Sequence, residues 1–168
     1  MAASALKPTG RRGRVQANLR GAVFGTVTAA AVIAATSAHE DGLDAILIAT
    51  VGTLIVFWLA HIYERILEGH HEGTTRLTWT TIWLAVVDEL PVIEAPLPSV
   101  LLLVAGAVGL LGYDAAVNLA LWMAVAQLVI WSLVAARRQK WSWTASVVFA
   151  AISALFGMGI IALKALLH

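Results

Sequence analysis

The chain contains no cysteine, which excludes disulfide bonds, thiolate metal sites and cysteine nucleophiles. Charged residues are scarce, at 12% of the 168 residues, against about 25% in soluble domains. Proline is also rare, and three of the four prolines lie between residues 91 and 98. With 60% of its residues hydrophobic and so few charged, the chain indicates a fold built in lipid.

Motifs of several reaction classes are absent as well. There is no Gly-x-Ser-x-Gly, no phosphate-binding loop, no His-Glu-x-x-His and no dinucleotide fingerprint. We therefore predict that the protein is not an enzyme. An intramembrane enzyme acting on a lipid-like substrate, with His61 and Glu64 as acid and base, stays open as the second alternative.

What the chain does have is five apolar stretches, each long enough or nearly long enough to cross a bilayer. They cover residues 21–38, 45–63, 98–112, 115–136 and 143–163. In lipid every backbone N–H and C=O needs a partner inside the protein, which favours α-helices for all five. The sequence therefore predicts an all-α fold, a multi-pass transmembrane helical bundle that forms one domain over residues 21–168.

Two basic clusters predict how this bundle is oriented. The expected topology anchors are Arg11, Arg12, Arg14, Arg20, Arg137, Arg138 and Lys140. Cytoplasmic loops are enriched in Lys and Arg. We therefore expect a bacterial cytoplasmic (inner) membrane protein with its N-terminus in the cytoplasm and its C-terminus outside. Residues 1–20 are expected to form a disordered cytoplasmic tail that touches anionic headgroups of the lipid bilayer and binds no nucleic acid.

The segment 64–97 must then begin and end on the cytoplasmic side. Its apolar run over 77–87 is too short to span at about 1.5 Å per residue. We expect an interfacial or re-entrant helix over 77–90, with Trp79 and Trp83 at headgroup level. Two alternatives stay open: an additional crossing by this run, and a third span that begins earlier, near Pro91.

The first polar cluster lies at the end of the second span and comprises His61, Glu64, Glu68, His70 and His71. His61, Glu64 and Glu68 share one face of a continued helix. Imidazole and carboxylate together suit zinc, iron or manganese. No cofactor is required by the sequence, but a divalent metal here stays open. The structural alternative is a wet helix end where Arg65 pairs with a carboxylate.

The second polar cluster comprises Asp88, Glu89 and Glu94, which the prolines surround. Carboxylates beside membrane helices are costly unless they are paired or hydrated. A broken, proline-rich element that holds them is typical of an ion path. The alternative is a surface loop in cytoplasmic water.

Helix packing is predicted from small residues on the first span. Gly21, Gly25 and Ala29 lie on one face, and such spacing lets two helices approach closely in lipid. The contact can lie within one chain or between the copies of a homo-oligomer. Asn118 and Gln127 are expected to form hydrogen bonds between helices.

Four segments resemble a group of small, Ala-rich bacterial integral membrane proteins of unassigned function. They are RGAVFGT at 20–26, FWLAHIY at 57–63, PVIEA at 91–95 and IIALK at 160–164. The five spans and the acidic insertion over 64–94 also resemble, more faintly, the vacuolar iron transporter family. That resemblance implies a cytosolic metal-binding insertion between the second and third spans. Where that family has Asn-Asp-Gly in its first helix, this chain reads GTVT at 25–28.

These observations give a ranked set of functional hypotheses. The leading one is cation- or proton-linked transport through the two polar clusters. The alternative is a non-catalytic membrane interaction or assembly protein, which the small-residue faces favour.

Overall fold

A computed structural model describes residues 11–39, 42–71 and 78–167, and it describes their side chains except at 11–17, 68–71, 163 and 167. All secondary structure within these residues is helical. The helices are α1 (Arg11–Ser37), α2 (Leu43–His71), α3 (Trp79–Asp88), α4 (Pro91–Glu94), α5 (Leu97–Ala107), α6 (Tyr113–Arg138) and α7 (Trp143–Leu167).

Membrane-spanning length and composition are found in four of these helices. Their apolar parts are Asn18–Ser37, Leu43–Leu67, Tyr113–Arg138 and Trp143–Leu166. A fifth candidate is interrupted between Glu94 and Leu97, at a point that we call the break. Its two parts, Trp79–Glu94 and Leu97–Ala107, are bent by 58° relative to each other. The predicted all-α membrane bundle of about five spans is thereby confirmed.

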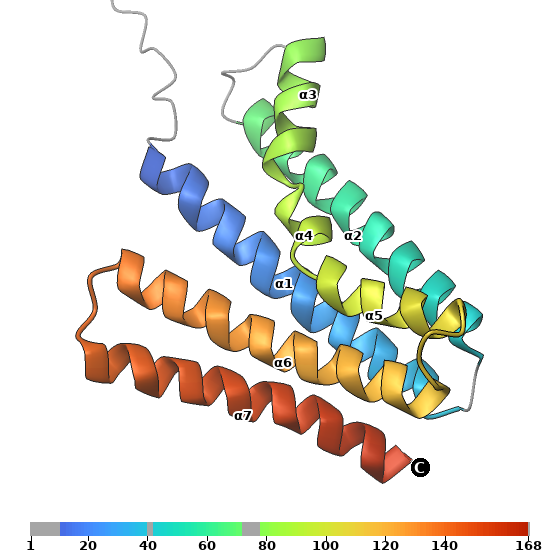
Figure 1. Ribbon diagram of the computed structural model, residues 1–168. Coiled ribbons are helices and arrows are strands. Elements are labelled where there is room, and N and C mark those ends of the chain that lie inside the picture. Colours follow the sequence, from blue (N-terminus) through green and yellow to red (C-terminus); the bar gives the residue numbers. More distant parts are fainter. Residues whose placement is uncertain (1–10, 40–41, 72–77, 168) are drawn as a thin grey trace, which may run out of the picture.

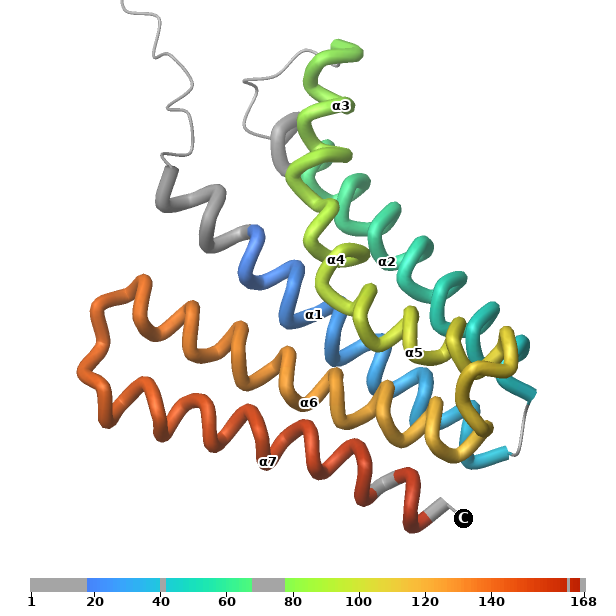
Figure 2. The backbone as a smooth tube through the Cα atoms, in the orientation of Figure 1, coloured from blue at the N-terminus to red at the C-terminus, as the bar shows by residue number. Residues whose placement is uncertain are grey.

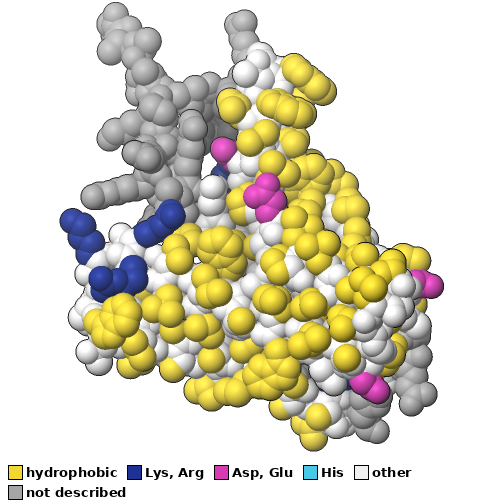
Figure 3. Space-filling view, viewed as in Figure 1, with side chains coloured by type: hydrophobic (Ala, Val, Ile, Leu, Met, Phe, Trp, Pro, Cys, Tyr) yellow, Lys and Arg dark blue, Asp and Glu magenta, His cyan; other side chains and the backbone are white. Residues whose placement is uncertain are grey.

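The five candidate spans, which we call the courses of the chain, run alternately in opposite directions (Figure 1). α1 and α2 are antiparallel neighbours, and α3, α4 and α5 return along α2 before α6 and α7 complete the bundle. The basic residues in the last turn of α6 lie at the end of the bundle where α1 begins, and Figure 3 shows Lys and Arg side chains gathered there. Asp44 and Asp114 open α2 and α6 at the opposite end.

The core is centred on α6, which packs against α1, α5 and α7 (Figure 2). Its inward face is lined by small residues, and Ala116, Ala120 and Ala124 are completely buried. Small side chains let neighbouring helices approach closely, so packing contacts can hold the bundle in lipid, where no hydrophobic effect draws helices together. Ile33, Ile46 and Leu103 complete the core from α1, α2 and α5.

Two predicted boundaries differ from the structure. Residues 11–20, expected in a disordered tail, form the first turns of α1. Arg, Gln, Ala and Leu dominate this stretch and are strong helix formers, so the helix continues beyond the apolar part. Residues 1–10 lie outside the described ranges. At the other boundary, α5 ends at Ala107 instead of residue 112, because Gly109 adopts a positive φ of 82° that ends the helix.

The segment 77–90 leads directly into the third span. α3 continues through α4 into α5 as one bent course alongside α2, which by length and composition is either a broken span or a re-entrant loop, so the re-entrant helix and the crossing both stay predictions. The third course therefore includes Pro91, as the alternative with an early start predicted. Trp79 and Trp83 are largely exposed on α3, and their location at headgroup level stays a prediction.

The glycine face of α1 receives the short helix α4. Gly21 and Gly25 are buried beneath it, and a Cβ added at Gly25 would overlap the carbonyl oxygen of Val92. That carbonyl has no helical donor, because the residue four positions on is Pro96, which lacks an N–H. Glycine at position 25 thus lets the backbone of α4 approach that of α1. A Cα–H of Gly25 then faces the carbonyl oxygen of Val92, which has no donor within its own helix.

We expect Gly25→Ala to destabilise the protein by about 1–3 kcal/mol, because the added methyl group forces α4 away from α1. The measurement is thermal unfolding in detergent, followed by circular dichroism. The matched control is Gly52→Ala, at a helical position with open space around it, where the change should be neutral or stabilising by up to about 1 kcal/mol. A Gly25→Ala protein as stable as the parent would contradict this packing.

Candidate functional site

The two carboxylates at the end of α3 are bound by one arginine from α2. Arg65 donates a hydrogen bond from Nη1 to Asp88 Oδ2 over 2.8 Å, and its Nε lies 3.0 Å from Glu89 Oε1. The side chain of Glu89 is only 11% exposed, whereas those of Arg65 and Asp88 are each 32% exposed. Charge-assisted bonds of this length are strong, and they fasten α3 to α2.

This arrangement bears on two interpretations of the polar clusters. Arg65 does pair with carboxylates, as the structural alternative for the first cluster predicted, and its partners come from the second cluster. Asp88 and Glu89 therefore share one guanidinium, and the three groups together keep one negative charge. In the described structure their ion pairs hold α3 against α2, and a part for them in an ion path stays a prediction.

The remaining residues of the first cluster do not join this group. His61 bonds through Nδ1 to the carbonyl oxygen of Phe57 over 2.8 Å, and its ring packs 4.9 Å from that of Phe24. Glu64 is exposed on α2. Glu68, His70 and His71 have side chains outside the described residues. Within the described part of the chain, no group of three or more His, Asp or Glu side chains could hold a metal ion.

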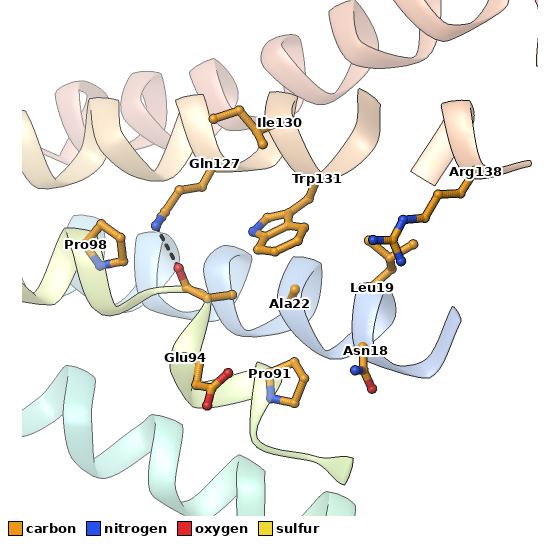
Figure 4. A pocket seen from close by; sticks show the side chains of 11 residues that line it. Asn18, Leu19, Ala22, Pro91, Glu94, Pro98, Gln127, Ile130, Trp131 and Arg138 are labelled. Carbon is orange, nitrogen blue, oxygen red and sulfur yellow. Dashed lines mark hydrogen bonds between the residues drawn. The ribbon is translucent and has the colours of Figure 1, made fainter. Parts of the chain in front are cut away.

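Glu94 has different surroundings from the other two acidic residues of its cluster. It is the last residue of α4, directly before the bend, and its exposed side chain lines a cavity of about 490 Å³ between α1, the break and α6 (Figure 4). No hydrogen bond or ion pair to its carboxylate occurs among the described residues. The cavity is lined by Asn18, Leu19, Ala22, Pro91, Glu94, Ala95, Pro98, Gln127, Ile130, Trp131 and Arg138.

The position of Glu94 along the bundle follows from the helix that α4 contacts. α4 packs on Gly21 and Gly25, and the apolar span of α1 begins at Asn18. At about 1.5 Å per residue, this contact lies about 5–10 Å inside the end of that span. α4, which ends at Glu94, therefore contacts α1 near the basic end of its apolar span.

Gln127 stabilises the break from the opposite side. Its Nε2 donates a hydrogen bond to the carbonyl oxygen of Ala95 over 2.7 Å, and its Oε1 accepts one from Ser99 Oγ over 3.1 Å (Figure 4). In a regular helix the Ser99 N–H would bond to Ala95, but here it bonds to the carbonyl oxygen of Pro96. The buried amide of Gln127 thus replaces the donor that the break removes.

Sequence reasoning identified Gln127 as a residue that bonds between helices but did not connect it to the break. The signal was present in part, since three prolines within eight residues must leave carbonyl groups without donors. The side chain that bonds to such a carbonyl group can come from a distant part of the chain, as Gln127 and Ala95 are 32 residues apart. Local periodicity in the sequence does not predict such a pair.

We expect Arg65→Met to destabilise the protein by about 1–3 kcal/mol, because it leaves the nearly buried Glu89 without a counter-charge although partial exposure of the cluster moderates the loss. Unfolding temperature in detergent measures it. The triple variant Arg65→Met, Asp88→Asn, Glu89→Gln should recover most of the loss, and Glu64→Gln on the same helix should have no effect. Equal losses in the single and triple variants would show that charge pairing is not the cause.

No family model, curated protein or solved structure matches this chain.

Proposed function

We propose that this protein is a cation- or proton-linked transporter of a bacterial cytoplasmic membrane, in which Glu94 binds the transported charge. The observation that carries the proposal is the carboxylate of Glu94, which lines a cavity near the basic end of the apolar span of α1 and pairs with no described side chain. An ionised carboxylate beside membrane helices is costly unless a proton, water or a cation accompanies it. Binding and release of that companion is the elementary step of transport.

The orientation of the bundle supports a cytoplasmic entrance to this site. Arg20, Arg137, Arg138 and Lys140 belong to one end of the bundle, and the positive-inside rule assigns that end to the cytoplasm; Arg138 is also part of the cavity lining. The N-terminus is then cytoplasmic and the C-terminus lies outside. A cation would reach Glu94 from the cytoplasmic leaflet.

The bent course α3–α4–α5 is the element that we expect to move. Transporters commonly bind substrate where a spanning helix is broken near the site. Here Gln127 bonds both to Ala95 at the end of α4 and to Ser99 in α5, so a small rotation of α5 would loosen the bond to Ser99. Arg65 holds α3 in place on the other side of the bend, so α3 and α5 can change their angle about a fixed end.

The alternative of a self-assembling structural protein receives less support. The small-residue face formed by Gly21, Gly25 and Ala29 is buried within the chain, where α4 covers the two glycines. This face is therefore not free to receive a second copy. The open apolar surfaces of α2 and α7 need no partner other than the lipid bilayer.

The test is flux into proteoliposomes that carry either a pH dye or a dye for divalent metal. We expect the protein to dissipate an imposed proton or Mn²⁺ gradient faster than protein-free liposomes, and Glu94→Gln to return the rate to that of protein-free liposomes. Asp114→Asn, which removes an exposed carboxylate at the other end of the bundle, should leave the rate unchanged. Equal flux in the parent and Glu94→Gln would remove Glu94 from the mechanism.

A further inference from the structure

The size and the lining of the cavity beside Glu94 suit a ligand larger than a bare ion. Its volume of about 490 Å³ falls in the range of about 300–1,000 Å³ that holds small organic ligands. Most of its lining is apolar, with Leu19, Ala22, Pro91 and Ile130 among the walls. An inorganic cation would gain nothing from such walls, whereas a ligand with apolar groups would bury them there.

The polar groups of the lining differ in what they can offer a ligand. Gln127 already uses its amide on Ala95 and Ser99. Arg138 belongs to the lining at the basic end of α6, eleven residues beyond Gln127, which corresponds to about 16 Å. Among the described residues of the lining, Glu94 is the only carboxylate, and none of the described residues forms an ion pair with it.

An aromatic ring adds a second feature that favours a cation. Trp131 lines the cavity one turn beyond Gln127 and reaches from α6 toward α1 and α4 (Figure 4). The face of an indole attracts organic cations, and more strongly when water is excluded. A carboxylate and an indole in one apolar cavity are complementary to a cation that carries hydrocarbon.

The rim of the cavity indicates how such a ligand would enter. Pro98 and Ile130 belong to the lining and are exposed on the outer surface of the bundle. In a membrane, that surface faces acyl chains. A molecule already dissolved in the cytoplasmic leaflet can therefore reach Glu94 sideways, without crossing the headgroup region again.

We propose that the cavity binds an amphipathic organic cation that partitions into the bilayer, with its charge on Glu94 and its apolar groups against Trp131 and Ile130. This inference rests on the proposed function, because it names the cargo of the same carboxylate. A divalent metal is a poorer fit, since the described lining supplies one carboxylate and no imidazole.

Equilibrium binding of tetraphenylphosphonium to the full-length protein in detergent tests the proposal. Tetraphenylborate has the same shape with the opposite charge, so it is the matched control ligand. We expect saturable binding of the cation and none of the anion. Glu94→Gln should weaken binding of the cation by about tenfold or more, as loss of a charge-assisted contact predicts. Ile130→Trp, which fills the cavity and keeps the carboxylate, should weaken it as well.

Two variants serve as controls for the binding measurement. Glu64→Gln removes an exposed carboxylate outside the cavity, and Leu119→Trp adds an indole at an exposed position of α6 that is not part of the lining. Both should bind the cation as the parent does. Circular dichroism melting of every variant separates weakened binding from loss of fold.

The outcomes also separate this inference from the proposed function. Glu94-dependent proton or Mn²⁺ flux without binding of tetraphenylphosphonium would overturn the inference and leave transport standing. Glu94-dependent binding without any flux would support the inference and refute transport. Equal binding of both probes, or displacement of the cation by phosphatidylethanolamine, would overturn the inference, because the cavity would then hold apolar molecules in general or a lipid amine.

Discussion

The rest of this structure depends on how the backbone is satisfied where three prolines break a membrane helix. Inside a bilayer a carbonyl group without a donor costs several kcal/mol. Pro96 removes the donor for Val92, and the turn at the break removes the donor for Ala95. Gly25 has no side chain, so the carbonyl group of Val92 can lie against the backbone of α1. The side-chain amide of Gln127 donates a hydrogen bond to the carbonyl oxygen of Ala95. These two contacts join α4 to α1 and α6 and fix the bend.

A bend held in this way creates the candidate site. Because α4 stops where it does, the last residue of the helix is a glutamate whose side chain faces the cavity between α1 and α6 instead of a helix neighbour. The other two carboxylates of the segment share Arg65, whereas no described residue forms an ion pair or hydrogen bond with the carboxylate of Glu94. The proposals on transport and on an organic cation both follow from this difference.

Local patterns in the sequence predicted the helical class, the five courses and the placement of both basic clusters at one end. The length of an apolar stretch and the position of a charged residue are local properties of the sequence, so they can be recognised without a structure. The partners of individual side chains are not local. Arg65 and Asp88 are 23 residues apart and Gln127 and Ala95 are 32 apart. How 77–90 joins the third span could not be predicted for the same reason, since it depends on the packing of α3 along α2.

The central claim is that α3, α4 and α5 together cross the membrane once, broken at the prolines. Because the chain has no cysteine, single cysteines can be placed at the exposed positions Thr78, Leu110 and Ser142 and labelled with a membrane-impermeant maleimide in intact and opened vesicles. The account predicts that Thr78→Cys and Ser142→Cys react from one side and Leu110→Cys from the other. Labelling of Thr78→Cys and Leu110→Cys from the same side would contradict it, because the segment would then be a re-entrant loop.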